Sequence, residues 1–201
     1  MPLILIRHGL ASAGVDDLDP GLDPVGQKQA ETTAEFLRGS NVGRLVVSPL
    51  RRTRETAQPL AEALGLAPEL REEVAEVFDP AMGADERKAM IGPFMAGRWT
   101  GQPEPLLEWR KRVVRTLIEL GIGGTASGHD VVVVTHYIAI GVAIGLALSD
   151  DRVVPMPVAN CSITILEAGR LGLSLVAGAT TPHLHEDMVT GVRTALPGGP
   201  A

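Results

Sequence analysis

The side chains best suited to chemistry are two histidines that each follow a short apolar run. His8 follows "LILIR" at residues 3–7, and His136 ends "DVVVVTH" at residues 130–136. Apolar runs of this length, next to Gly, Pro or polar residues, predict buried β-strands. Parallel strands end at a shared edge of the sheet, where α/β proteins bind ligands. We therefore expect both imidazoles to face one pocket.

Arginines are expected at the same edge of the sheet. Arg7 precedes His8, and a strand predicted at 44–48 leads into "SPLRRTRETA", whose first turn carries Arg51, Arg52 and Arg54. A guanidinium group binds phosphate oxygens through parallel hydrogen bonds, and the free N–H groups of a helix N-terminus add positive potential. This combination predicts a phosphoryl-binding pocket. Ser48 is expected to cap the helix. Arg51 and Arg54 are expected to be solvated charges on the helix surface.

The rest of the chain must supply the sheet that positions these residues. Alternating strand and helix signals predict an α/β fold with a mostly parallel central sheet and helices on both faces. The expected strands are 3–7, 44–48, 74–78, 130–136, 162–166 and 171–176, and the expected helices are 25–37, 49–64, 85–90, 105–120 and 138–148. We expect a single domain over residues 1–185, an irregular insertion at 79–104 near the active site, and a C-terminal tail at 186–201.

The composition is that of an ordinary globular protein. With 201 residues, a formal net charge of −6 and a pI near 5.4, nothing electrostatic favours nucleic acid or an anionic membrane as a partner. The single cysteine, Cys161, cannot form an internal disulfide, and the N-terminus has no signal-like apolar region. The apolar stretch at 138–148 is too short to span a bilayer. These features favour a cytoplasmic protein, whose oligomeric state the sequence leaves open.

Ordered sequence blocks resemble the histidine phosphatase superfamily, which contains phosphoglycerate mutases and histidine acid phosphatases. The blocks are "RHG" after the first strand, "SPLRRTRETA" after the second and "VVVVTH" late in the chain, supported by "LDPVGQKQA", "EWRKRV" and "NCSITIL". The resemblance covers about residues 2–185. It implies a phosphoglycerate mutase-like fold, a phosphorylated substrate, and a reaction that needs no metal or cofactor.

The resemblance also implies roles for single residues. His8 matches the nucleophile, which is transiently phosphorylated, and His136 matches the second catalytic histidine. Arg7 and Arg52 match the arginines that hold phosphate oxygens. Glu76 in "VAEVF" matches the general acid, and burial could raise its pKa as that role requires. Because "FDPAMGADE" replaces the family's usual sequel, the alternatives for the acid are Glu73, Asp79 and Glu86.

Departures from the mutase pattern favour the phosphatase branch. Gly14 stands where mutases of the family carry an asparagine, and the sequence "YIA" at 137–139 stands in place of their G-N-S. We therefore expect a phosphomonoester hydrolase that forms a phosphohistidine at His8 and acts on a small phosphorylated metabolite or a phosphoprotein. The alternatives are a phosphoglycerate-type mutase and a non-catalytic phosphoryl-binding protein. Apolar residues of the insertion could line the substrate pocket: Met82, Met90, Phe94, Met95 and Trp99.

A metal site is one more alternative. "HLHED" at 183–187 combines histidines with carboxylates, and "DDLDP" at 16–20 is another acidic cluster, so together they could hold a divalent ion. His183 and Leu184, however, resemble the superfamily's common H-L ending. We therefore expect no metal in the protein.

Overall fold

A six-stranded sheet forms the centre of the protein. The computed structural model describes residues 1–12, 17, 19–78, 84–169 and 172–192, and at 84–88 it describes the backbone alone. The strands, in the order in which they lie side by side, are β3 (Pro68–Leu70), β2 (Val42–Val47), β4 (Asp130–Thr135), β1 (Leu3–Arg7), β5 (Ile163–Gly169) and β6 (Gly172–Thr180). β3, β2, β4 and β1 run parallel, β5 is antiparallel to β1, and β6 is antiparallel to β5. The mostly parallel sheet predicted from the sequence is confirmed.

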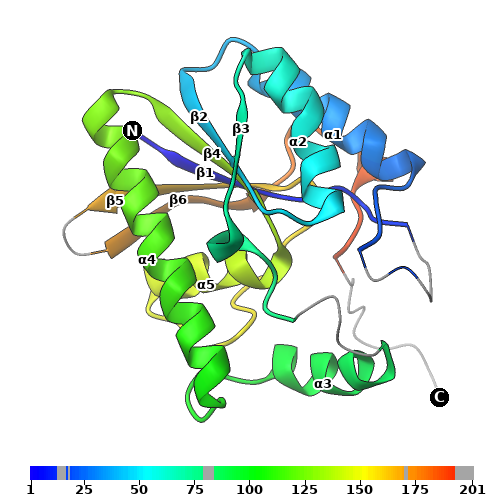
Figure 1. Cartoon of the computed structure of the whole chain (residues 1–201), viewed down its shortest axis with the longest axis vertical. Coiled ribbons are helices and arrows are strands. Elements are labelled where there is room, and N and C mark those ends of the chain that lie inside the picture. Colours follow the sequence, from blue (N-terminus) through cyan, green and yellow to red (C-terminus); the bar gives the residue numbers. More distant parts are fainter. Residues whose placement is uncertain (13–16, 18, 79–83, 170–171, 193–201) are drawn as a thin grey trace.

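Helices cover both faces of this sheet (Figure 1). The helices α1 (Pro24–Leu37) and α2 (Arg51–Leu64) pack on one face, and α4 (Glu104–Ser127) and α5 (Tyr137–Leu148) pack on the other. Side chains alternate along β1, so that Ile4 and Ile6 lie in the α1–α2 layer, whereas Leu3 and Leu5 lie in the α4–α5 layer. Covered on both faces, the central strands read as continuous apolar runs. No helix in the described part of the chain is both long and apolar enough to cross a membrane.

Strand register brings the two candidate histidines to one edge of the sheet. Arg7, the last residue of β1, pairs with Thr135, the last residue of β4. The ladder continues one step further, because the His8 N–H donates to Thr135 O at 2.9 Å. His8 and His136 therefore leave adjacent parallel strands side by side.

Ser48 leaves β2 at the same edge but does not cap the helix that follows. Its N–H donates to Val134 O at 3.1 Å, which keeps it in the sheet, and its hydroxyl reaches the Leu50 N–H at a long 3.5 Å. The helix α2 begins at Arg51, whose N–H donates to the Asp19 carboxylate at 2.9 Å. The predicted cap at Ser48 is wrong, because the helix begins at Arg51 and the carboxylate of Asp19 accepts the N–H of this first residue.

The strand expected at 74–78 is also wrong. A 3-10 turn spans Glu72–Val74 and is followed by an irregular segment without strand pairing. The apolar alternation in "VAEVF" resembles a strand, but Val74 packs into the α4–α5 layer and its carbonyl accepts the Thr135 hydroxyl at 2.6 Å. This contact ties the segment that carries Glu76 to the end of β4.

The insertion contains a longer helix than expected, α3 (Ala84–Ala96), which lies apart from the sheet in Figure 1. A chain of aromatic contacts anchors it. Phe78 meets Phe94 at 5.3 Å between ring centroids, Phe94 meets Trp99 at 5.5 Å, and Trp99 stacks on Trp109 of α4 at 6.1 Å. The Trp99 N–H also donates to Asp151 O at 2.9 Å. The C-terminal end of α3 is therefore packed onto the body of the protein.

Candidate active site

His8 is fixed in one orientation in the turn after β1. Its Nδ1 lies 2.8 Å from Gly9 O, and Arg52 Nε lies 3.3 Å from its Nε2. Because a carbonyl oxygen only accepts and a guanidinium only donates, the neutral ring carries its proton on Nδ1 and a lone pair on Nε2. Asn160 Nδ2 donates to the His8 carbonyl at 2.9 Å and holds the turn. The imidazole therefore offers Nε2 as its nucleophilic atom.

The turn that carries His8 leaves no room for a side chain at Gly9. A Cβ at Gly9 would lie 2.6 Å from Gly26 O, at the start of α1. The Gly9 N–H donates to Thr56 Oγ1 of α2 at 3.0 Å. The glycine thus lets the strand exit pass against both helices, which fixes the backbone next to His8.

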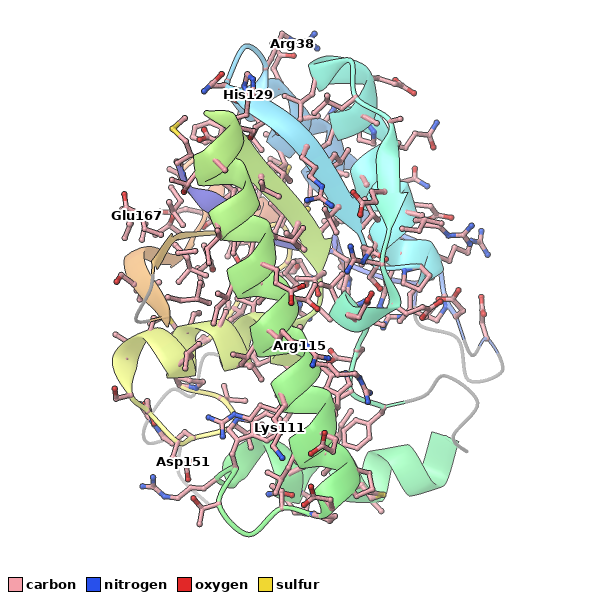
Figure 2. All side chains as sticks on the ribbon, turned by 60° about the vertical axis from the view of Figure 1, so that its left-hand side comes forward. Arg38, Lys111, Arg115, His129, Asp151 and Glu167 are labelled. Carbon is pink, nitrogen blue, oxygen red and sulfur yellow. The ribbon has the colours of Figure 1, made fainter. Side chains whose placement is uncertain are left out.

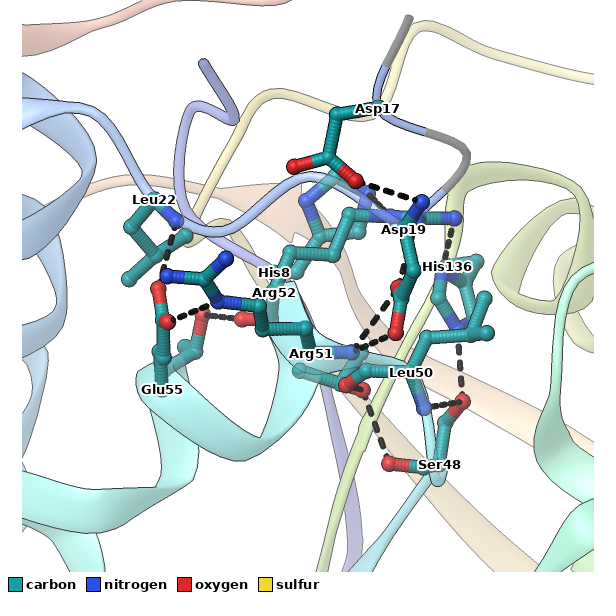
Figure 3. Close-up of polar contacts among 12 residues, drawn as sticks. His8, Asp17, Asp19, Leu22, Ser48, Leu50, Arg51, Arg52, Glu55 and His136 are labelled. Atoms are coloured by element: carbon teal, nitrogen blue, oxygen red, sulfur yellow. Dashed lines mark hydrogen bonds and ion pairs between the residues drawn. The ribbon is translucent and has the colours of Figure 1, made fainter. Parts of the chain in front are cut away.

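His136 lies beside His8, with the ring centroids 5.3 Å apart (Figure 3). Its Nε2 lies 2.7 Å from Ser48 Oγ, and Arg52 Nη2 lies 3.3 Å from its Nδ1. Since Arg52 can only donate, Nδ1 of the neutral ring accepts and Nε2–H donates to the Ser48 hydroxyl. Ser48 therefore orients His136, a role that sequence reasoning missed because the local signal at Ser48 is that of a helix cap.

Arg52 is the arginine of the "SPLRRTRETA" block that contacts the imidazoles. It lies in the first turn of α2 and donates to both rings, and the Asp19 carboxylate lies 3.7 Å from its Nη1. Arg51 pairs instead with Glu55 at 2.7 Å, and Arg54 is exposed. A cation at this place can hold the oxygens of a bound phosphoryl group.

Arg7 lines the same cavity from the end of β1. Its Nη1 donates to Val158 O at 2.7 Å and to Gly191 O at 3.1 Å, and its guanidinium lies 4.9 Å from the centre of the Tyr137 ring. Within the described residues, its buried Nε has no hydrogen-bond partner. Burial lowers the pKa of Arg7 to about 10, so the side chain stays positive at neutral pH. A buried cation with an unsatisfied N–H is suited to an anionic ligand.

Residues 188–191 close one side of the site. Gln29 Nε2 donates to Met188 O at 2.6 Å and to Thr190 Oγ1 at 2.8 Å, and the Thr190 hydroxyl donates to Asn160 Oδ1 at 3.1 Å. Asn160 is the residue that holds the His8 carbonyl. These residues belong to the segment that the sequence assigns to a tail, and nothing in their composition signals contact with the site.

Glu76 reaches the cavity from the segment after the 3-10 turn. The Val77 N–H donates to its Oε1 at 3.0 Å, and the Ile138 N–H at the start of α5 also hydrogen-bonds the carboxylate. Burial raises the pKa of Glu76, against the opposing effect of these bonds and of the Arg52 and Arg7 charges. A carboxyl group with a raised pKa holds its proton closer to neutral pH, as a general acid must.

Glu73 is less suited than Glu76 to the role of general acid. Arg71 binds the Glu73 carboxylate at 3.1 Å and lowers its pKa, which is the wrong direction for a proton donor. Asp79 and the side chain of Glu86 lie outside the described residues. Within the described part of the chain, Glu76 is the carboxyl group that lines one cavity with His8.

Both histidines are held in the neutral form. Burial lowers the pKa of His8 well below 6.5, and the charges of Arg7 and Arg52 lower it further. Burial also lowers the pKa of His136 well below 6.5, with added effects from His8 and the same arginines. Near neutral pH, His8 therefore keeps the lone pair that a nucleophile needs.

A cavity of about 380 Å³ opens on Arg7, His8 and Glu76. Arg7, His8, Glu76 and the Tyr137 hydroxyl are its polar side-chain groups, and its other lining residues are Phe78, Ile91, Met95, Ile138, Pro157 and Gly191. Of the insertion residues expected to line a pocket, Met95 does so. Phe94 and Trp99 are buried in the core, Met90 is exposed, and Met82 lies outside the described residues.

The histidines near the C-terminus are not gathered into a metal site. His183 Nε2 lies 3.0 Å from Thr33 Oγ1, and His185 pairs with Asp187 at 2.8 Å. Among the residues that the structure describes, no group of at least three His, Cys, Asp or Glu side chains is placed to hold a metal ion.

Known proteins share both sequence and fold with this chain. The family model of the histidine phosphatase superfamily (branch 1) matches residues 3–180. A 2,3-bisphosphoglycerate-dependent phosphoglycerate mutase from Thermoplasma acidophilum is 29% identical over 192 residues, which cover 88% of this chain and 91% of that protein.

Solved structures add the likeness of the fold. Phosphoserine phosphatase from Entamoeba histolytica, in complex with 3-phosphoglyceric acid, has a TM-score of 0.71 at 24% identity over 92% of this chain and 99% of its own. YhfR from Bacillus stearothermophilus has a TM-score of 0.74 at 18% identity over 90% of this chain and 98% of its own. Since the family model spans almost the whole chain, the protein belongs to the histidine phosphatase superfamily.

Proposed function

We propose that this chain is a phosphomonoester hydrolase that works through a covalent phosphohistidine at His8 and needs no metal ion. The observation that carries the proposal is the lone pair on His8 Nε2, because the Nδ1 contact with Gly9 O fixes the tautomer and Arg52 flanks the nucleophilic atom. A covalent intermediate divides a difficult displacement into two easier steps.

In the first step, His8 Nε2 attacks phosphorus, and the bond from phosphorus to the leaving oxygen breaks. Arg7 and Arg52 hold the phosphoryl oxygens and stabilise the charge of the transition state. His136, beside Arg52, completes the group of side chains around these oxygens. Glu76 protonates the leaving oxygen, so that the alcohol departs neutral.

In the second step, the Glu76 carboxylate takes a proton from a water molecule, whose oxygen attacks phosphorus. The bond between phosphorus and Nε2 breaks and inorganic phosphate leaves. His8 is again a neutral imidazole and Glu76 again a carboxylic acid, so the cycle closes without a net change in the protein.

The cavity supports hydrolysis over mutase chemistry. A mutase must keep the dephosphorylated intermediate bound until the phosphoryl group returns, which requires polar contacts to that intermediate. Here Tyr137 and Ile138, directly after His136, line the cavity together with further apolar side chains. Relatives named as phosphatases and relatives named as mutases are both similar to this chain. Our preference for hydrolysis therefore rests on the apolar lining of the cavity. We propose a small phosphorylated molecule as the substrate and a cytoplasmic location, which suits the buried free thiol of Cys161.

The first experiment measures phosphate release from p-nitrophenyl phosphate in the presence of a chelator. It compares the wild type with His8→Ala and His129→Ala. His129 precedes β4, at the opposite end of the strand from His136, and so controls for the loss of an imidazole (Figure 2). We expect full activity in the chelator-treated wild type and the His129 variant, and a loss of about 10³-fold or more in His8→Ala. Activity that persists in His8→Ala would exclude His8 as the nucleophile.

A second experiment separates an enzyme from a phosphoryl-binding protein. The wild type is incubated with a radiolabelled phosphate ester, quenched and denatured. We expect a covalent label that is labile in acid and stable in base, and none in His8→Ala. A wild type that binds phosphate but takes no label would be a binding protein. Transfer of the label between positions of phosphoglycerate, without phosphate release, would indicate a mutase.

A further inference from the structure

We infer that the substrate of this enzyme is a phosphomonoester with an apolar leaving group that carries no second charge near the phosphate. The inference rests on the proposed function and adds the substrate class to it. It is carried by the contrast between the two parts of one cavity: Arg7, His8 and Glu76 on one side, and a largely apolar wall on the other.

The polar groups of the cavity are already engaged by the phosphoryl chemistry. Arg7 is the cation among the described lining residues, and Glu76 would repel a second anion whenever it is ionised. Apart from these groups and His8, the hydroxyl of Tyr137 is the polar side-chain group on the described walls. Among the described residues the walls offer no second cation, so a carboxylate next to the phosphate, as in phosphoglycerate, would lose its water there without a described charged partner, which is unfavourable.

The apolar wall is assembled from separate parts of the chain. Ile91 and Met95 lie four residues apart and so face the same side of α3. Ile138 comes from the first turn of α5, Phe78 from the segment after Glu76, and Pro157 from the loop before β5. The contacts of Phe94 and Trp99 hold the C-terminal end of α3 onto the body. The wall is thus assembled from separate segments, and Ile91 keeps 37% of its surface exposed.

The cavity is large enough for such a leaving group. A buried space of roughly 150 Å³ binds benzene in another protein. The cavity here, about 380 Å³, can hold a phosphoryl group together with an alkyl chain or one aromatic ring. Apolar surface buried there is removed from water, which favours binding in proportion to its area.

The test uses alkyl phosphates, because simple alcohols of different length have similar acidity as leaving groups. Values of kcat/KM are measured for ethyl, butyl and hexyl phosphate, with glycerol phosphate and 3-phosphoglycerate as polar comparisons. Burying one methylene group favours binding roughly fourfold. We expect kcat/KM to rise at least about tenfold from ethyl to hexyl phosphate and to be lowest for 3-phosphoglycerate. Equal values across the alkyl series, or a preference for 3-phosphoglycerate, would overturn the inference.

Substitutions on α3 test whether the apolar wall causes the preference for longer alkyl chains. Met95→Ser and Ile91→Ser, which each add a hydroxyl and remove apolar surface, should flatten the trend with chain length. Met90→Ser is the matched control, because Met90 is 41% exposed on the same helix and does not line the cavity. A trend that survives in both wall variants, or is lost equally in the Met90 variant, would contradict the assignment.

Binding measurements keep this test separate from that of the proposed function. Alkylphosphonates carry a carbon–phosphorus bond and are not hydrolysed, so their affinity can be measured by calorimetry whether or not the protein turns over esters. Absence of turnover for every ester would overturn the proposed hydrolase. Equal affinity for ethyl- and hexylphosphonate would overturn the apolar leaving-group site, and a rise of about tenfold or more would support it.

Discussion

The hydroxyl of Ser48 lies 2.7 Å from Nε2 of His136, while Arg52 donates to the other nitrogen of the same ring. These neighbours assign the proton of neutral His136 to Nε2. In His8 the assignment is reversed, because Nδ1 faces Gly9 O and Arg52 faces Nε2. One guanidinium thus holds two adjacent imidazoles in opposite tautomers.

Ser48→Ala tests this arrangement. Removing the hydroxyl leaves Nε2–H of His136 without its acceptor, so we expect kcat to fall roughly 10- to 100-fold, as for other residues that orient a functional imidazole. KM should change less. Nitrogen NMR of the imidazole rings should find the Nε2–H tautomer for His136 and the Nδ1–H tautomer for His8 in the wild type. Detection of Nδ1–H on His136 in the wild type would contradict the assignment, and Ser48→Thr should recover part of the lost rate.

Arg52→Ala should lower kcat about 10²- to 10³-fold, the range found for removal of one group that stabilises a developing oxyanion. Arg54→Ala is the matched control, since Arg54 lies on the same helix and is exposed. Steady-state kinetics with p-nitrophenyl phosphate measures both variants. Equal losses in the two variants would show that general positive charge, rather than the contacts of Arg52, supports catalysis.

The pH dependence of Glu76 gives a third prediction. Burial raises the pKa of Glu76, so its protonated form is lost as the pH rises through that pKa. For an alkyl phosphate, kcat/KM should therefore fall on the alkaline side of the profile. Glu76→Gln should remove this limb and lower the rate about 10²- to 10⁴-fold.

The choice of leaving group separates acid catalysis from a structural effect of Glu76→Gln. p-Nitrophenolate leaves without a proton, so in the first turnover the variant should release p-nitrophenolate with a much smaller loss of rate than it shows for the alcohol of an alkyl phosphate. Glu73→Gln serves as the control, because Glu73 is paired with Arg71. Equal losses of Glu76→Gln in the first-turnover release of both leaving groups would argue against a proton-donor role.

The buried histidines also predict how stability changes with pH. Burial lowers the pKa of His8 and His136 well below 6.5, so the unfolded chain binds protons that the folded chain does not. Below pH 6.5, and down to the folded-state pKa, the free energy of unfolding should fall as the pH falls. Between pH 6.5 and 5.5 each histidine should lower it by roughly 1 kcal/mol, because the unfolded imidazole is half protonated at pH 6.5 and almost fully protonated at pH 5.5.

Urea denaturation at several pH values between 6.5 and 5.5 measures this decrease. His8→Asn removes one of the two groups, so over this window its free energy of unfolding should fall by roughly 1 kcal/mol less than that of the wild type. An unchanged decrease in His8→Asn would mean that His8 is protonated equally in the folded and unfolded states.

The ends of the central strands could be predicted because their signal is local. β1 and β4 are covered on both faces and therefore read as short apolar runs, each followed by a pair of polar residues that ends in a histidine, His8 or His136. That both lie at one edge follows from the parallel arrangement. The register of Arg7 with Thr135, which sets their spacing, depends on pairing between distant segments and has no local signal.

Other features depend on contacts that no short window contains. α4 continues past its predicted end because Gly121 packs close to the sheet, where a Cβ would lie 2.5 Å from the Ala168 Cβ. A glycine that usually ends a helix is kept here by tertiary packing. Ser48 gave a similar error, since its partner His136 is far away in the sequence. In both cases a local preference was overridden by a long-range contact.

The contacts of residues 188–191 with the site affect when the site can form during synthesis on the ribosome. Arg7 and His8 are synthesised first, but the groups that hold them, Asn160 and Gly191, are added much later. At roughly 5–20 residues per second, this interval is on the order of ten to forty seconds. A nascent chain that has not reached residue 191 carries the histidine but lacks a contact of Arg7. The arginine that is proposed to hold the phosphoryl oxygens therefore gains this hydrogen bond last, and full activity toward phosphate esters should appear only after residue 191 has left the ribosome.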